Sequence, residues 1–143
     1  MVEVLNRQRL QKIDLHEYQK FSARALQAIH QKSQNATIVF VSDAIIKKLN
    51  RQFRGKNQAT DVLSFPARAE PFETEHEPDL GEVVISLQRA AEQAKENQIT
   101  FQSEVKQLIL HGLLHLSGYD HETDDGEMDR LELRLRKRLG IQE

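Results

Sequence analysis

The sequence predicts an α+β fold: one domain spanning residues 1–143, in which about five helices cover a mixed four-stranded sheet. Three observations support this prediction. Strand-like and helix-like segments alternate in the first half of the chain, two strand-like segments then follow one another, and helical patterns fill the remainder. The two consecutive strands flank residues 68–79, which are rich in proline and acids and predict a loop between them. A chain of 143 residues is the size of a single ordinary domain.

The first three elements follow from their hydrophobic periodicity. Val2 and Val4 alternate with a charged residue, which predicts a short strand. Between residues 16 and 30 the apolar side chains recur at helical spacing, so a helix follows that strand. Residues 36–41 (ATIVFV) are mostly β-branched or aromatic, which is typical of a buried strand.

The middle of the chain predicts a helix and then a hairpin. Ser42 or Asp43 can cap a helix whose apolar positions begin at residue 45. Residues 62–65 are strand-like, and the strand is expected to stop at Pro66 because proline cannot donate to a ladder. The strand pattern resumes over residues 80–87, which makes an antiparallel pairing with the preceding strand the simplest arrangement.

Three helices are expected in the last third. Ser86 can begin the first of them, and Thr100 can cap a second helix that is apolar almost all round and is therefore expected to be buried. Asp124 and Glu127 resemble a capping box at the start of the last helix. In that helix Glu132 precedes Arg136 at i,i+4, the spacing of a helical ion pair.

Composition excludes several classes of protein. The chain has no cysteine, so disulfide scaffolds, thiolate zinc sites, iron–sulfur clusters and cysteine nucleophiles are excluded. The net charge of −2 excludes a globally basic nucleic-acid binder, and any polyanion contact must come from a local patch. The first residues lack a signal-peptide core, and no apolar stretch is long enough for a membrane span, so we expect a cytoplasmic protein with no membrane partner.

Histidines cluster at the end of the buried helix. His111 and His115 are four residues apart and project from one helix face, Gly118 is suited to end the helix, and His121 follows the turn. The pattern H-x-x-x-H-x-x-G-x-x-H predicts three nitrogen ligands for one Zn²⁺, with a fourth position open for water or substrate. The remaining three histidines lack partners at ligand spacing and are expected at the surface, namely His16, His30 and His76.

The spacing is similar to the metzincin protease signature, with one difference. Position 112 is Gly, whereas those proteases carry the Glu that acts as general base. The metal geometry therefore survives and the peptidase mechanism does not. Because Gly112 has no side chain, we also expect room for a bulky group to approach the helix beside the metal.

A basic segment covers residues 47–56, which contain no acid. Its positive charges could follow an RNA backbone, with Phe53 available for stacking, although a solvated helix face explains each lysine equally well. Residues 120–129 hold six acids and could confine RNA to the basic side. The candidate RNA-binding residues are Lys47, Lys48, Arg51, Arg54 and Lys56.

Several motifs together resemble the YbeY family of bacterial endoribonucleases. Residues 111–121 (HGLLHLSGYDH) match its H-G-x-L-H-L-x-G-Y-D-H signature. Residues 49–54 followed by 60–66 (TDVLSFP) match a second block, and residues 80–86 resemble its L-G-D-x-x-I-S strand, with Glu82 in place of the usual Asp. The resemblance extends over nearly the whole chain and implies a zincin-like domain.

The resemblance implies a zinc-dependent, single-strand-specific endoribonuclease. The implied roles are maturation of the 16S ribosomal RNA 3′ end and ribosome quality control, with ribosomal RNA, the small ribosomal subunit and its assembly proteins as partners. Arg54 matches the functional arginine of the family and, with His111, is the expected catalytic residue. Asp120 is adjacent to a ligand and could orient its imidazole, although it is equally an ordinary turn residue.

Two other functions remain open at this point. The near-neutral charge and the absent general base are compatible with a ribosome-assembly or RNA-binding factor whose metal is structural. A metal-dependent hydrolase of non-RNA substrates, such as a peptidase or amidase with a base from elsewhere in the fold, is the third alternative.

Overall fold

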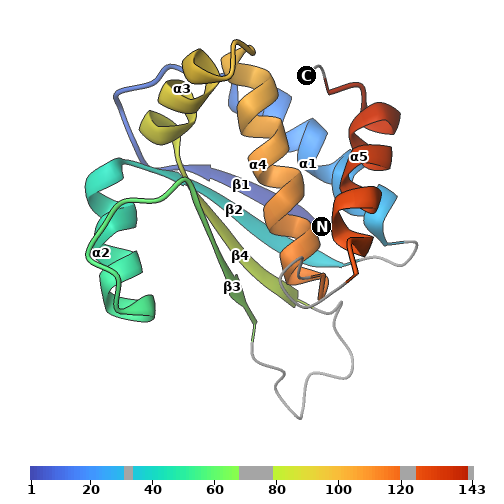
Figure 1. Cartoon of the computed structure of the whole chain (residues 1–143), viewed down its shortest axis with the longest axis horizontal. Coiled ribbons are helices and arrows are strands. Elements are labelled where there is room, and N and C mark those ends of the chain that lie inside the picture. The colour runs from blue at the N-terminus through green and yellow to red at the C-terminus, as the bar shows by residue number, and fades with distance from the viewer. Residues whose placement is uncertain (31–33, 68–78, 120–124, 142–143) are drawn as a thin grey trace.

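A mixed four-stranded sheet forms the centre of the protein (Figure 1). The computed structural model describes residues 1–30, 34–67, 79–119 and 125–141. The strands lie in the order β1-β2-β4-β3; β1, β2 and β4 are parallel, and β3 is antiparallel to β4. The α+β class and the hairpin predicted from the sequence are thus confirmed. The strand bounds are β1 (Val2–Asn6), β2 (Asn35–Val41), β3 (Val62–Pro66) and β4 (Asp79–Ser86).

In the described part of the chain, five helices cover the two faces of the sheet unequally (Figure 1). The larger core brings α1, α3, α4 and α5 against one face, whereas α2 packs on the other face over a smaller cluster. Within the described ranges, no helix combines the length and apolarity that crossing a bilayer requires. The helix bounds are α1 (Leu15–Ile29), α2 (Asp43–Arg54), α3 (Leu87–Glu96), α4 (Phe101–Leu116) and α5 (Glu127–Leu139).

The alternation of side chains along the strands explains the two cores. In β2, Ile38 and Phe40 are fully buried in the larger core, whereas Val41 belongs to the cluster beneath α2. Successive side chains of a strand point to opposite faces, so a strand with helices on both sides is apolar at nearly every position. This requirement accounts for the continuous ATIVFV run in the sequence.

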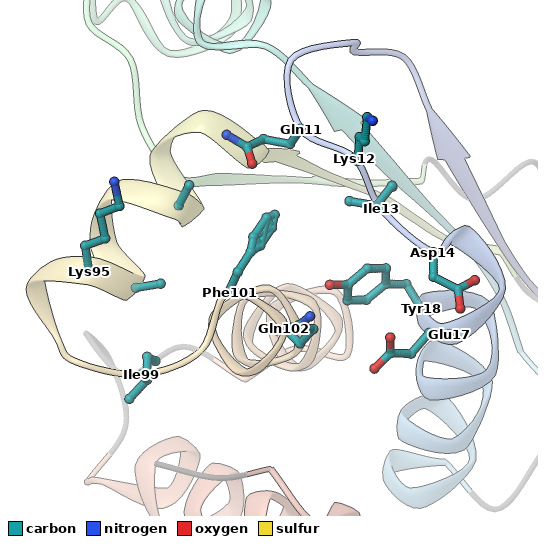
Figure 2. Close-up of a pocket in the computed structure, with 12 residues that line it drawn as sticks. Gln11, Lys12, Ile13, Asp14, Glu17, Tyr18, Lys95, Ile99, Phe101 and Gln102 are labelled. Carbon is teal, nitrogen blue, oxygen red and sulfur yellow. The ribbon is translucent and has the colours of Figure 1, made fainter.

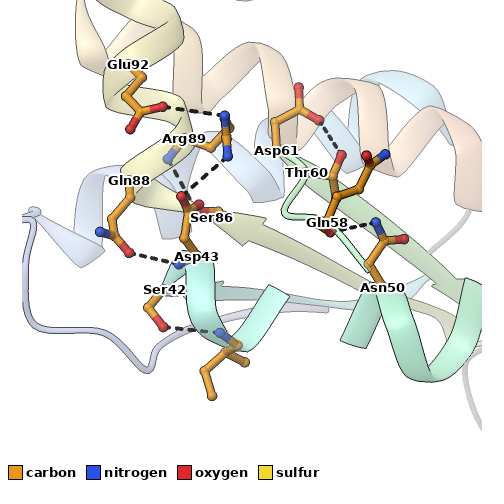
Figure 3. A network of polar contacts seen from close by, with 11 residues as sticks. Ser42, Asp43, Asn50, Gln58, Thr60, Asp61, Ser86, Gln88, Arg89 and Glu92 are labelled. Carbon is orange, nitrogen blue, oxygen red and sulfur yellow. Dashed lines mark hydrogen bonds and ion pairs between the residues drawn. The ribbon is translucent and has the colours of Figure 1, made fainter. Parts of the chain in front are cut away.

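Serine and threonine caps begin three helices as predicted. Ser42, rather than Asp43, is the N-cap of α2, and Ser86 and Thr100 cap α3 and α4 through hydrogen bonds accepted from backbone N–H groups. Asp43 instead accepts a hydrogen bond from the Ser86 hydroxyl and pairs with Arg89 at 3.5 Å (Figure 3). The network joins the starts of α2 and α3 at one end of the sheet.

Two predicted element ends are wrong in an informative way. Pro66 belongs to β3 and pairs with Gly81. Because β3 is an edge strand, the N–H group that proline lacks is not needed for a hydrogen bond to another strand. The last helix begins at Glu127 after Gly126, whose positive φ of 87° forms the cap without a side-chain hydrogen bond. The expected capping box is therefore not what starts α5, and Asp124 itself lies outside the described residues.

A buried carboxyl near the start of α4 gives the fold a pH dependence. Burial, and then the charge of Asp61, raise the pKa of Glu104, and the charge of Arg136 opposes them to a smaller extent. With its amide nitrogen turned towards both acids, Gln93 donates to Glu104 at 2.8 Å and to Asp61 at 3.3 Å. Folding therefore disfavours the ionised form of Glu104, and ionisation lowers the free energy of unfolding.

We expect Glu104→Gln to raise the free energy of unfolding at neutral pH. A carboxyl whose pKa is raised by folding destabilises the protein progressively as pH rises from its unfolded pKa through its folded pKa. The advantage of the variant should therefore grow as pH rises towards and beyond neutrality, and it should vanish below about pH 4. Urea unfolding across this range measures it, with the exposed Glu92→Gln as control. An advantage independent of pH would contradict the assignment.

Candidate metal centre

The two helix histidines face one another near the end of α4. His111 and His115 are half-buried, and their Nε2 atoms are 3.1 Å apart, with the rings at 76°. They lie on the narrow strip of α4 that stays accessible, because residues on both sides of the strip are buried in the core. The helix ends at Leu116, and Gly118 then adopts the positive φ of 96° predicted for it. Both imidazoles thus project from one face of the helix, as their spacing predicts.

A buried carboxylate of α5 contacts the His111 ring at the nitrogen that faces away from His115. Glu132 Oε1 lies 3.2 Å from His111 Nδ1 and 3.7 Å from an Arg136 guanidinium nitrogen. Sequence reasoning assigned this residue only a helical ion pair with Arg136 and missed its contact with His111. The available signal was its place on the buried face of α5, which carries Met128, Glu132, Leu135 and Leu139.

The donor set fits zinc. Two nitrogens bound tetrahedrally to zinc lie about 3.3 Å apart, close to the observed separation, and a carboxylate on the outer ring nitrogen is the usual support for a ligating histidine. Among the described residues, no third His, Cys, Asp or Glu joins the pair into a group of three. The third predicted ligand, His121, and the predicted supporting carboxylate, Asp120, lie outside the described residues.

Gly112 brings the histidine helix close to the sheet. A Cβ at this position would lie 2.4 Å from Val83 Cγ1, and the Ser64 hydroxyl donates to the Gly112 carbonyl at 3.5 Å. The expectation that the missing side chain leaves room for a bulky group is therefore wrong. The space is filled by β4, and the glycine serves the packing of α4 on the sheet.

One histidine expected at the surface is instead packed against the end of α4. His30 is half-buried, burial lowers its pKa, and its Nε2 lies 2.7 Å from Ser117 Oγ. Ser117 donates its hydroxyl proton to the Leu113 carbonyl, so His30 donates to the serine and does not activate it as a nucleophile. His16 is exposed as predicted, and His76 lies outside the described residues.

The basic segment lies on the opposite side of the sheet from the histidine pair. Its five cations are all exposed along α2 and just beyond it, and Arg54 is the last residue of the helix. Phe53 is 60% exposed and contacts Phe65 of β3 edge-to-face. Since the neighbouring Ser64 points to α4, the edge strand β3 is the element that connects the two regions. No described contact joins Arg54 directly to the imidazoles.

A separate pocket of about 510 Å³ lies at the far end of α4, between α1 and α3 (Figure 2). Phe101 and Gln102 line it, together with Tyr18, whose pKa is raised to about 12 by burial and then by nearby acids. Phe101 precedes His111 by ten residues, about 15 Å along the helix axis. The pocket is thus distinct from the histidine pair.

Comparison with known proteins identifies the family of this chain. Residues 3–140 match the family model described as Endoribonuclease YbeY. A relative of that name from Solibacter usitatus is 48% identical over 103 residues, which cover 72% of this chain and 65% of the relative. Another, from Geobacter metallireducens, is 34% identical over 143 residues, which cover 99% of this chain and 95% of the relative.

A solved structure supports the same assignment. The solution structure of TM1509 from Thermotoga maritima is 30% identical in sequence and superimposes with a TM-score of 0.65, covering 97% of this chain and 89% of that one. The family match runs from the second residue of β1 to the end of α5, and it includes α4 with its two histidines. The chain therefore belongs to the YbeY endoribonuclease family.

Proposed function

We propose that this protein is a zinc-dependent, single-strand-specific endoribonuclease of the cytoplasm. Its substrate would be ribosomal RNA on the small subunit, with maturation of the 16S 3′ end and ribosome quality control as its roles. The observation that carries the proposal is the convergence of the His111 and His115 Nε2 atoms, with the outer nitrogen of the first ring held by a buried carboxylate. Membership of the YbeY family supports the choice of RNA as substrate.

The histidines and Gly112 have different roles in the proposed reaction. His111, His115 and His121 would hold the zinc, which when bound can lower the pKa of a water molecule and polarise a phosphoryl oxygen. Three protein ligands leave room for the substrate. Gly112 cannot supply the base of a metzincin, and Val83 occupies the space a side chain there would need. Peptide hydrolysis is accordingly the less supported alternative.

The RNA backbone would be held by the cations of α2. Arg54 can clamp a phosphate through two parallel hydrogen bonds, and the exposed Phe53 ring offers a base a surface to stack on. The strand between this end of α2 and the histidines is an edge strand, so no further strand of the sheet separates the two regions. A single strand of RNA that crosses the β3 edge could therefore contact both regions.

We expect Arg54→Glu to reduce cleavage of single-stranded RNA by about 100-fold or more, which corresponds to the loss of a charge-assisted phosphate contact. Bound zinc should not change, because Arg54 ends α2, which packs on the opposite face of the sheet from α4. Cleavage rates and metal content measured on the same preparations test both points. A double-stranded RNA and a peptide serve as comparison substrates.

Arg9→Glu provides the matched control. Arg9 is exposed in the connection between β1 and α1, and its replacement changes the net charge by the same amount. If both variants lose activity equally, the effect reflects overall charge and not a specific phosphate contact. If the wild type binds RNA without cutting it, the assembly-factor alternative replaces the nuclease proposal.

A further inference from the structure

Glu132 is a carboxylate in a place that normally holds an apolar side chain. It is 7% exposed, and it occupies the buried face of α5 between Met128 and Leu135. A buried charge lowers stability unless partners compensate for its desolvation. Its described partners are the His111 ring and, one helical turn away, Arg136. These two contacts therefore compensate for the desolvation of the Glu132 carboxylate.

The contact with His111 determines where the imidazole protons lie. A carboxylate can only accept hydrogen bonds, so His111 Nδ1 must carry a hydrogen and donate it at 3.2 Å. The neutral ring then has its lone pair on Nε2, the atom that lies 3.1 Å from His115 Nε2. The carboxylate therefore selects the tautomer that can ligate a metal through Nε2, and it restrains rotation of the ring.

Arg136 restrains the carboxylate in turn. Its guanidinium lies 3.7 Å from the same Oε1 that contacts His111, at i,i+4 spacing on α5, and its side chain is only 24% exposed. A chain of contacts thus runs from Arg136 through Glu132 to His111 and ends at the imidazole pair. The ordering of each group reduces the freedom of the next.

We propose that Glu132 is a positioning residue for the metal centre: through the Nδ1 hydrogen bond it presents His111 Nε2 to the zinc. This inference rests on the proposed function of the histidine pair. It assigns a role to α5, which carries no residue of the histidine motif. A purely structural role, in which Glu132 only joins α4 to α5, predicts a different result in the experiment below.

Glu132→Gln is the informative substitution. Glutamine has almost the same shape, but its amide can either accept from His111 Nδ1 or donate to it, so it no longer dictates the tautomer. Titration of the metal-free protein with zinc against a competing chelator should show affinity about 10- to 100-fold weaker than wild type. The exposed Asp129→Asn, on the same helix, loses the same charge and should bind zinc as the wild type does.

The imidazole tautomer supplies a readout that needs no metal. Long-range ¹H–¹⁵N spectra of the metal-free wild type should show His111 protonated on Nδ1, and the Gln variant should show both tautomers. Thermal unfolding of each variant establishes that it is folded. Unchanged zinc affinity together with an unchanged tautomer would overturn the proposal in favour of the structural role.

The same experiment separates failure of this inference from failure of the proposed function. A wild-type protein that does not bind zinc would refute the metal function. The spectra of the metal-free protein would then still decide whether Glu132 sets the His111 tautomer. Tight zinc binding by the wild type and the Gln variant alike, with one tautomer in both, would leave the metal function intact and refute the role of Glu132.

Discussion

Replacing His115 with alanine is expected to remove zinc binding and to lower RNA cleavage by at least about 1,000-fold. The substitution deletes one of the two nitrogens that face each other at 3.1 Å. A site that has lost one of three ligands holds the metal far less tightly, so the Lewis acid disappears with the imidazole. Metal content and the rate of single-stranded RNA cleavage are to be measured on the same purified variant.

Gln107→Ala is the matched control for this prediction. Gln107 lies two helical turns before His115 on the same half-accessible strip of α4, so its truncation tests the effect of altering that strip without touching a nitrogen of the pair. The control should keep both its zinc and its activity. A His115→Ala protein that is folded, free of zinc and still active would refute the metal-dependent mechanism.

The second large effect concerns stability. Gly112→Ala is expected to lower the free energy of unfolding by about 1–3 kcal/mol, because the added methyl would meet Val83 Cγ1 at 2.4 Å inside a packed core. Gly112→Glu, which restores the metzincin residue, should fail to fold stably, since it would also bury a charge there. Equilibrium denaturation in urea measures the first variant, and soluble yield with circular dichroism assesses the second.

A double-mutant cycle identifies the cause. Val83→Ala removes the methyl groups that Gly112→Ala would strike, so the double variant should be more stable than the sum of the two single effects predicts. Gly140→Ala is the control: its φ of 74° strains any side chain, but nothing lies within 4 Å of its Cβ. It should therefore show no coupling to position 83. Additivity in both cycles would mean that the close approach of α4 to β4 is not what requires a glycine.

Local pattern was sufficient for most of the fold. Caps such as Thr100 and the apolar ATIVFV strand act over a few residues, so their effects can be predicted from the neighbouring sequence. The edge position of β3 could not be predicted in this way, because it depends on strand order. The local pattern therefore predicts that the strand ends before Pro66, whereas in the structure β3 includes Pro66.

In the site, too, local features could be predicted from the sequence and long-range contacts could not. The His111–His115 pair follows from helical spacing alone. The contacts of Glu132 with His111 and of His30 with Ser117 join residues 21 and 87 positions apart, and neither separation leaves a local signature. Gly112 is a third case. The motif draws attention to the missing side chain, but Val83, against which Gly112 packs, lies on a strand 29 positions earlier. Tertiary packing, which no local window contains, decides all three.

The hydrogen bond between α4 and α5 has a consequence for the order of events during synthesis. Both histidines of α4 leave the ribosome before α5, which is the last described helix and carries Glu132. Until α5 docks its face of Met128, Leu135 and Leu139, the larger core is incomplete and the His111 ring lacks its carboxylate. Under the proposed function, zinc is therefore expected to bind tightly at the histidine pair only after α5 has docked.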